Sequence, residues 1–512
     1  MMSVLISPKN FFSRFLIVFV GLWLLNGCIT DHRLPPSTPL PDAEFYALTD
    51  NNQLLRYNAR SLGAPQSTAT ITGLEPGERI LSIDFRPATG QLYGVSSSRL
   101  YVINPMTGAA RMVGTAAFSP ALVGSKVSID FNPTVDRIRL VTNAGQNLRL
   151  HPELGTVIAT DGSINGVPGA MISTIGYTNN KAGVTTSVLY DIDPVTDKLY
   201  RQDPPNNGTL AEVGPLNVDV ADAMGFDISP NGDAIVVVRV GSQVELSQIN
   251  IMTGGLQKLG NLPPNITGLA IPTEPVAFAV DGSNNLLIFN PMNPMPVSRA
   301  ITGLQTGEMI LGIDFRPATG QLFALGSSSR LYILNTSNGM AAAVGGAAFS
   351  TPLAGSDFGF DFNPLVDRIR VVSNTGQNLR LNPNDGTLVA VDGPLNPGTP
   401  VATASAYTNN FVGASTTILY NIDTKAGDVA RLTQQIPPNN GTQIPVGILG
   451  FEVANANGFD IGGMSNMAYA LLRNTSGQTK IYSVNLNTGA ATPTSDFPGN
   501  PTIRGFAIGL GF

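Results

Sequence analysis

Residues 83–92 read IDFRPATGQL, and residues 313–322 read the same ten letters. The match continues along the chain at a nearly constant offset. DFNPTVDRIRLVTNAGQNLRL at 130–150 returns as DFNPLVDRIRVVSNTGQNLRL at 361–381. A match of this length indicates that the second half of the chain is a copy of the first. Two domains are also expected from a length of 512 residues, since one core rarely grows past about 250–300 residues.

A shorter period runs inside each half. In the first half the phrase apolar-Asp-apolar-x-Pro, or a variant of it, occurs five times, and the steps between successive last residues are 46, 46, 51 and 42. A four-stranded propeller blade takes about 40–45 residues, so each phrase predicts one blade. In one such unit, strands are expected at 80–85, 92–95, 100–103 and 111–114, because Pro/Gly/Asn turns separate short runs of Val, Ile, Tyr and Phe.

Neither half holds complete units at its ends. Residues 45–74 supply three strands without the first strand of a blade, and 266–271 supply a first strand without its blade. Pairing them closes a ring and removes open sheet edges. Residues 276–304 and 503–510 complement each other in the same way. The predicted fold is all-β: two tandem β-propellers of about five four-stranded blades each. One ten-bladed ring is the alternative, because 266–271 leads directly into the second half.

The N-terminus follows the plan of a secretory signal. Lys9 and Arg14 precede an apolar run at 15–25, which is too short for a mature membrane helix of about 20 residues. The run ends in Leu-Asn-Gly-Cys28, which resembles the lipobox of bacterial lipoproteins, and Cys28 is the one cysteine of the chain. The resemblance implies cleavage before Cys28 and acylation of its thiol and amine. The residues that follow are not the aspartate that retains lipoproteins at the inner membrane, so a Gram-negative cell would place the protein at the outer membrane.

The domain plan follows from these features. We expect a lipoprotein signal peptide at 1–27, a proline-rich tether at 28–42, a first propeller at 43–273 and a second at 274–512. The tether composition is that of a semi-rigid extended spacer. With 55 glycines and 38 prolines the chain has the profile of a turn-rich β protein. A net charge of −6 without basic clusters argues against nucleic acid as a partner.

The repeated phrases IDFRPATGQLYG, DRIRLVTNAGQNLRL and YTNN resemble a bacterial family, the domain of unknown function numbered 4394. The resemblance covers both halves, 45–272 and 276–512. It implies a propeller-like exported domain and little about activity. The phrases LYVINPMTG and IYSVNLNTG are similar to lactonase-like and surface-layer-type propellers in a way that is generic to propellers.

The aspartates of the repeated phrase are the first candidate site. Each falls near the end of an innermost strand, so three carboxylates per half are expected around one mouth of a central channel. Such a ring would suit Ca²⁺ or general acid–base work. Alternatively, each aspartate accepts hydrogen bonds from the following turn or pairs with an arginine, and the near once-per-blade recurrence favours this structural role. The six residues are Asp84, Asp130, Asp227, Asp314, Asp361 and Asp460.

Arginines that alternate with aliphatic residues are the second candidate site. They could line an anion site or bridge to Asp130, Asp361 and turn carbonyls, since a polar stripe between packed blades needs partners. The tyrosine and asparagine of each YTNN phrase are candidate ligand contacts. The ten residues are Arg137, Arg139, Arg149, Tyr177, Asn179, Arg368, Arg370, Arg380, Tyr407 and Asn409.

Nucleophilic catalysis lacks its base in this sequence. His32 lies in the tether, and His151 is replaced by Asn382 in the other copy; a Ser or Cys nucleophile needs a histidine or another base. The run DIDPVTD at 191–197 is interpreted as a hairpin turn, since its copy loses two of three acids. We therefore predict a non-catalytic binding or scaffold module of the cell envelope, anchored to the membrane by lipid. No catalytic residue and no cofactor are expected, and the partner would be an envelope protein, a glycan or a small ligand. A metal-assisted hydrolase of lactonase-like propeller type, with Ca²⁺ at the carboxylate ring, is the alternative.

Overall fold

The computed structural model describes residues 40–425, 427–454 and 458–512. Over these ranges the chain is all-β, with ten four-stranded antiparallel sheets in two halves and two single-turn 3₁₀ helices, Pro205–Asn207 and Pro438–Asn440. Cys28, the signal segment and nearly all of the tether lie outside the described residues. No helix within the described ranges has the length and apolar character that a membrane crossing requires.

The first half contains five sheets, each built from strands that pair in the order given. They are β4 (Ser82–Phe85), β5 (Leu92–Val95), β6 (Leu100–Ile103) and β7 (Ala110–Val113); β8 (Val127–Asn132), β9 (Arg137–Thr142), β10 (Asn147–Leu150) and β11 (Val157–Thr160); β12 (Thr174–Tyr177), β13 (Leu189–Asp193), β14 (Lys198–Gln202) and β15 (Leu210–Pro215); β16 (Asp222–Ile228), β17 (Ala234–Val240), β18 (Gln243–Ile249) and β19 (Leu256–Leu262); and β20 (Ile266–Ala270), β1 (Glu44–Thr49), β2 (Gln53–Asn58) and β3 (Ser67–Thr70).

The second half repeats this plan. Its sheets are β40 (Ile503–Ile508), β21 (Ala277–Asp281), β22 (Asn285–Asn290) and β23 (Asn293–Ala300); β24 (Ile310–Phe315), β25 (Leu322–Gly326), β26 (Arg330–Leu334) and β27 (Ala341–Val344); β28 (Phe358–Asn363), β29 (Arg368–Ser373), β30 (Asn378–Leu381) and β31 (Leu388–Val391); β32 (Ala402–Tyr407), β33 (Leu419–Asp423), β34 (Arg431–Gln435) and β35 (Gln443–Ile448); and β36 (Gly458–Ile461), β37 (Ala468–Arg473), β38 (Thr479–Val484) and β39 (Ala491–Asp496).

The last strand of each half joins the sheet that begins the same half. β20 pairs antiparallel with β1, with Ala47 opposite Leu269, and β40 pairs with β21, with Ala279 opposite Phe506. The alternative of a single ten-bladed ring is therefore wrong, since it required β20 to pair with β21. In each half the innermost strands contact one another in circular order: β4, β8, β12, β16, β20 and back to β4, and β24, β28, β32, β36, β40 and back to β24.

Short turns and apolar strands explain this architecture locally. In the turn after β4 the Gly90 N–H donates to the Arg86 carbonyl (2.8 Å), and Gly90 adopts a φ of +72°, which glycine reaches without strain. Strands such as β17 are buried on both faces over most of their length, because neighbouring sheets cover each side. The apolar clusters consequently lie between successive sheets, for example Leu246 of β18 with Phe45 of β1.

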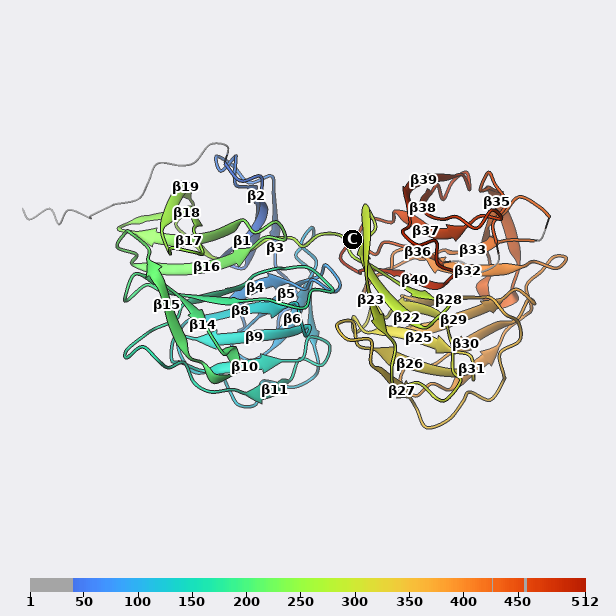
Figure 1. The fold of residues 1–512 in the computed structure, drawn as a ribbon, viewed down its shortest axis with the longest axis horizontal. Coiled ribbons are helices and arrows are strands. Elements are labelled where there is room, and N and C mark those ends of the chain that lie inside the picture. The colour runs from blue at the N-terminus through green and yellow to red at the C-terminus, as the bar shows by residue number, and fades with distance from the viewer. Residues whose placement is uncertain (1–39, 426, 455–457) are drawn as a thin grey trace, which may run out of the picture.

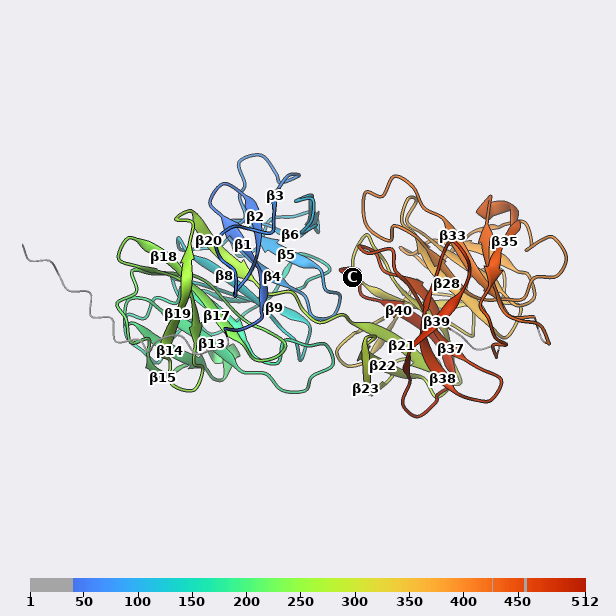
Figure 2. The same cartoon turned by 90° about the horizontal axis from the view of Figure 1, so that it is seen from above.

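The two halves lie side by side, joined by the segment after β20 (Figure 1 and Figure 2). Side chains and backbone connect them directly. Thr336 Oγ1 donates to Asp136 Oδ2 (2.8 Å), and the Gly511 N–H donates to the Thr89 carbonyl (2.8 Å). The fully buried Arg86 forms ion pairs with Asp136 and Glu153 at this junction. The junction is thus a packed and hydrogen-bonded surface, and a loop of each half reaches the other half.

Candidate functional site

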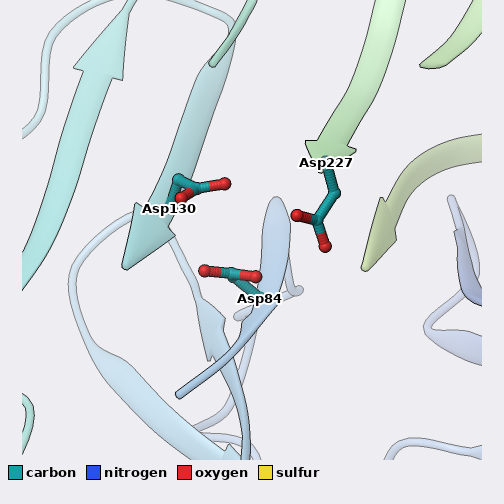
Figure 3. Close-up of side chains that lie close together, drawn as sticks. All are labelled: Asp84, Asp130 and Asp227. Atoms are coloured by element: carbon teal, nitrogen blue, oxygen red, sulfur yellow. The ribbon is translucent and has the colours of Figure 1, made fainter. Parts of the chain in front are cut away.

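Three aspartates of the first half meet where their strands end, as the sequence predicted. Asp84 lies on β4, Asp130 on β8 and Asp227 on β16, and their side chains point toward one another (Figure 3). One carboxylate oxygen from each lies within 4.8 Å of the others. Asp314, Asp361 and Asp460 form the same cluster in the second half. We call each set an aspartate trio.

Backbone N–H groups hold the carboxylates in place. Asp84 accepts from its neighbour Phe85 (2.8 Å) and from Phe131 on the next sheet (2.7 Å). Asp227 likewise accepts from the Ile271 N–H beyond β20 (2.6 Å). Each aspartate therefore connects its own innermost strand to the next one around the half. The remaining contacts of this kind are Tyr177 N–H to Asp130, Phe362 N–H to Asp314, Tyr407 N–H to Asp361 and Ile508 N–H to Asp460.

Burial changes the acidity of the trios. It raises the pKa of Asp84 and Asp130 well above the usual carboxyl value, and the neighbouring carboxylates raise it further. The pKa of Asp227 rises to about 7, and so does that of Asp460, mainly through burial. The expected arginine pairing does not occur at Asp130: Arg139 lies opposite it in register but forms its ion pair with Asp161. No cation among the described residues therefore balances the negative charge that the ionised carboxylates of a trio would carry.

Two arrangements would avoid an unbalanced negative charge in a trio: its carboxyl groups keep their protons, or the trio binds a cation. Carboxylate oxygens are suitable Ca²⁺ ligands, and one oxygen from each aspartate lies within 4.8 Å of the others. Three such ligands supply half or less of the six to eight oxygens that Ca²⁺ takes. Each aspartate side chain is at most 2 % exposed, so a substrate has no access to it. The trios therefore fit a structural cation better than a reaction centre.

The arginines form a second, denser polar cluster. Arg139 Nη1 donates to Asp161 Oδ2 (2.5 Å), and Arg149 donates to both oxygens of the same carboxylate (2.8 and 3.0 Å). Asn147 Oδ1 also accepts from Arg139 Nη1 (2.8 Å), and Asn206 Oδ1 accepts from Arg139 Nη2 (2.6 Å). One carboxylate thus holds two guanidinium groups, which leaves the cluster positively charged.

The second half contains the same arrangement. Arg370 and Arg380 share Asp392, with distances of 2.6 and 2.7 Å to its Oδ2. Arg368 donates to the Asp367 carbonyl (2.8 Å), as Arg137 does to the carbonyl before it (2.7 Å). The predicted bridges to turn carbonyls are therefore found, whereas Asp361 is not the partner of these arginines.

A cavity of about 240 Å³ opens onto the arginine cluster of the second half. Arg368, Arg370 and Arg380 line it together with Tyr407 and Asn439, and the lining contains no acidic residue. The buried Tyr407 turns its hydroxyl toward Arg370 Nε (3.5 Å), as Tyr177 does toward Arg139 in the other half (3.4 Å). We call this space the arginine pocket.

The asparagines of the YTNN phrases do not join the arginine clusters. Asn179 donates to the Thr186 carbonyl (2.9 Å) and Asn409 to the Thr416 carbonyl (2.8 Å), and both have positive φ. They shape a loop. Sequence reasoning also missed the counter-ions Asp161 and Asp392. Both belong to the segment just after a repeated strand, and nothing in that local pattern points to the arginines.

His151 provides no catalytic base for a neighbouring nucleophile. Burial, together with the nearby Arg137 and Arg86, lowers its pKa to about 4. Its Nδ1 accepts the Glu153 backbone N–H (3.3 Å). The imidazole is therefore neutral at neutral pH and caps a turn.

This fold defines a class of proteins built from two homologous all-β halves, each with five four-stranded sheets and an aspartate trio. The chain belongs to the family described as Domain of unknown function (DUF4394), whose profile matches residues 53–270 and 285–507. The two matched regions are tandem copies of the domain. No curated protein matches the chain in sequence.

Among solved structures, the chain is similar to the extracellular domain of a one-component system protein from B. thetaiotaomicron, with 13% identity and a TM-score of 0.25. That match covers 88% of this chain and 58% of the other, so this chain spans little more than half of its length. A protein from Bacteroides uniformis named as a 6-phosphogluconolactonase gives 17% identity and a TM-score of 0.26, over 65% of this chain and 97% of the other. At these TM-scores neither likeness carries an inference about fold or activity.

Proposed function

We propose that this protein is a lipid-anchored cell-envelope module of two five-bladed β-propellers, which binds an acidic group on a glycan or small molecule without transforming it. The arginine pocket is the observation that carries the proposal. Its lining brings three guanidinium groups and a tyrosine to one cavity of about 240 Å³. Preorganised guanidinium groups bind phosphate and carboxylate groups strongly and with defined geometry.

The propeller assignment rests on circular order. In each half the innermost strands contact one another around a ring, and the last strand completes the sheet of the first three. Each trio aspartate adds a hydrogen bond across one of these sheet boundaries. In a propeller, the last strand pairs with the first sheet of the ring, so no sheet edge at the closure is left open to aggregation.

The envelope assignment rests on the N-terminal sequence. The apolar run at 15–25 and the Leu-Asn-Gly-Cys28 sequence support export and acylation at Cys28. The proline-rich residues 28–42 would then hold the body away from the membrane surface. Radiolabelled palmitate incorporation into the full chain, compared with a Cys28→Ser variant, tests the anchor. Equal labelling of both chains would contradict it.

The binding proposal is tested with the chain from residue 29 and inorganic phosphate or glucuronate as probes. Calorimetric titration should give millimolar or tighter binding, which weakens about tenfold when Arg380→Gln and Arg149→Gln are combined, since a charge-assisted hydrogen bond contributes about 1.5–3 kcal/mol. Arg431→Gln is the matched control, because that arginine is exposed and pairs with Asp428 three residues away. Absence of binding in the unsubstituted chain, or equal weakening by the control, would contradict the proposal.

The aspartate trios favour a structural cation as a second property. A thermal melt of the same chain with chelator and with added Ca²⁺ tests it, because a ligand that binds only the folded state raises the melting temperature. A drop with chelator would support bound metal. Identical melts would contradict the metal and, with it, the metal-assisted hydrolase.

A further inference from the structure

A second cavity, of about 430 Å³, lies between the two halves. The first half contributes one wall from the sheet β4–β7, including Leu92, Val102 and Ile103. The second half contributes the loop 410–413, Met464 and Leu510. A volume of this size, at a domain interface and lined mainly by apolar side chains, is typical of a small-molecule site, for which the usual range is about 300–1,000 Å³. We call it the junction cavity.

One charged side chain, that of Arg111 on β7, lines the junction cavity. It is half-buried, and burial lowers its pKa. Among the described residues its guanidinium donates one hydrogen bond, to the neighbouring Met112 carbonyl (3.3 Å), and it forms no ion pair. A half-buried cation without a carboxylate beside it can form a charge-assisted hydrogen bond with an anionic ligand.

The duplicated half shows that the blade itself does not need Arg111. Arg111 pairs in register with Val102, and the corresponding pair in the second half is Ala342 with Ile333. The loop at the equivalent place in the first half, 181–183, packs onto the other half: Arg299 donates to the Gly183 carbonyl (2.8 Å), and Ala182 contacts an apolar cluster there. The loop 410–413, by contrast, borders a cavity beside the sheet β4–β7, with the cation Arg111 in its wall.

We propose that the junction cavity binds an amphipathic carboxylic acid, with its carboxylate on Arg111 and its apolar body between the sheet β4–β7 and the loop 410–413. This site is separate from the arginine pocket. An apolar body buries against Leu92, Ile103 and Leu510, and the acid supplies the charge that Arg111 lacks. A charge-assisted pair in a largely apolar site would dominate the selectivity for acid over alcohol.

Titration of the chain from residue 29 with decanoate and with decanol tests this. We expect decanoate to bind at least tenfold more tightly than decanol. Arg111→Ala introduces the residue that the second half has at this position. It should weaken decanoate binding at least tenfold and leave decanol binding unchanged. Arg111→Lys should retain part of the preference, because the charge remains. No measurable decanoate binding, or an unchanged preference in Arg111→Ala, would overturn the proposal.

A cavity-filling variant locates the site. Ala109→Trp places a large ring from an exposed, cavity-lining position, and it should abolish both ligands while the melting temperature shows that the chain is folded. Retained decanoate binding would mean adsorption elsewhere and would overturn the assignment. Phosphate binding at the arginine pocket should be the same in all three variants, so failure of one site is distinguishable from failure of the other.

Discussion

The two halves of this protein agree where their sheets are held together and differ where they meet each other. Each trio makes the same backbone hydrogen bonds at nearly the same lengths, and each arginine cluster shares one carboxylate. At the junction, by contrast, Arg111 corresponds to Ala342 and Glu153 to Asn384. The trios and arginine clusters, which both halves share, thus hold each half together. The residues that differ, such as Arg111 and Glu153, lie where one half faces the other.

A second difference lies inside a sheet. Asn421 of β33 donates to Gln435 (2.8 Å) and Gln443 (3.0 Å) and accepts from Ser405 (2.6 Å). Its counterpart Asp191 on β13 is fully buried, and neither of its oxygens has a partner among the described residues. Burial raises the pKa of Asp191 well above the usual value. Burial therefore disfavours the charged form of this carboxyl in the first half, whereas the second half has a neutral amide in its place.

The largest effect should come from pH, and both halves should share it. Asp227 and Asp460 have folded-state pKa values of about 7, above the value of about 3.9 in an unfolded chain. Folding therefore binds protons, so stability is greatest below pH 4 with respect to these groups and declines as pH rises through 7. Urea unfolding with chelator at pH 5, 6, 7 and 8 should show a loss of several kcal/mol, since one pKa unit corresponds to about 1.4 kcal/mol. A flat profile would mean that the trios are not protonated, and recovery at pH 8 with Ca²⁺ would identify a cation in their place.

Removing one trio member should destabilise either half equally. Asp84→Ala and Asp314→Ala each leave two backbone N–H groups without acceptors, including Phe131 and Phe362 on the next strand. An unpaired buried polar group costs about 1–3 kcal/mol, so we expect about 3 kcal/mol for each variant in urea unfolding at pH 7. A loss confined to one half would mean that only that half uses its trio structurally.

The exchange of Asp191 and Asn421 sharpens the comparison inside the sheets. Asn421→Asp removes the amide donor that serves two glutamines, and should cost about 2 kcal/mol at pH 8. Asp191→Asn should do the reverse and stabilise by about 1 kcal/mol at pH 8, with no gain at pH 4, where the native carboxyl is protonated. Both values come from the same urea experiment. Stabilisation of equal size at both pH values would contradict a protonated Asp191.

The smallest effect concerns the carboxylate at the junction. Glu153 pairs with Arg86 at 2.8 Å, and in the second half Asn384 accepts from Arg316 at 2.7 Å instead. Because Asp136 remains as the main partner of Arg86 and a glutamine oxygen can still accept from the guanidinium, Glu153→Gln should change stability by less than about 1 kcal/mol. A loss comparable with that of Asp84→Ala would show that the junction needs both acids.

Much of this architecture follows from the sequence, because strand periodicity and turns are local. The identical run at 83–92 and 313–322 established two copies, and one phrase per unit predicted sheets that the structure contains. The incomplete ends predicted the pairings of β20 with β1 and of β40 with β21. The spacing also placed the aspartates at the ends of innermost strands, where they meet.

Only the tertiary structure decided which side chains became partners. Arg139 could have paired with Asp130, its cross-strand neighbour, but it meets Asp161 beyond β11 and Asn206 in the 3₁₀ helix between β14 and β15. No sequence pattern singles out Arg111, because its significance depends on having no ion-pair partner among the described residues and on a loop of the other half. Such contacts depend on how rigid sheets are rotated and docked against one another, and residue spacing along the chain does not specify that geometry.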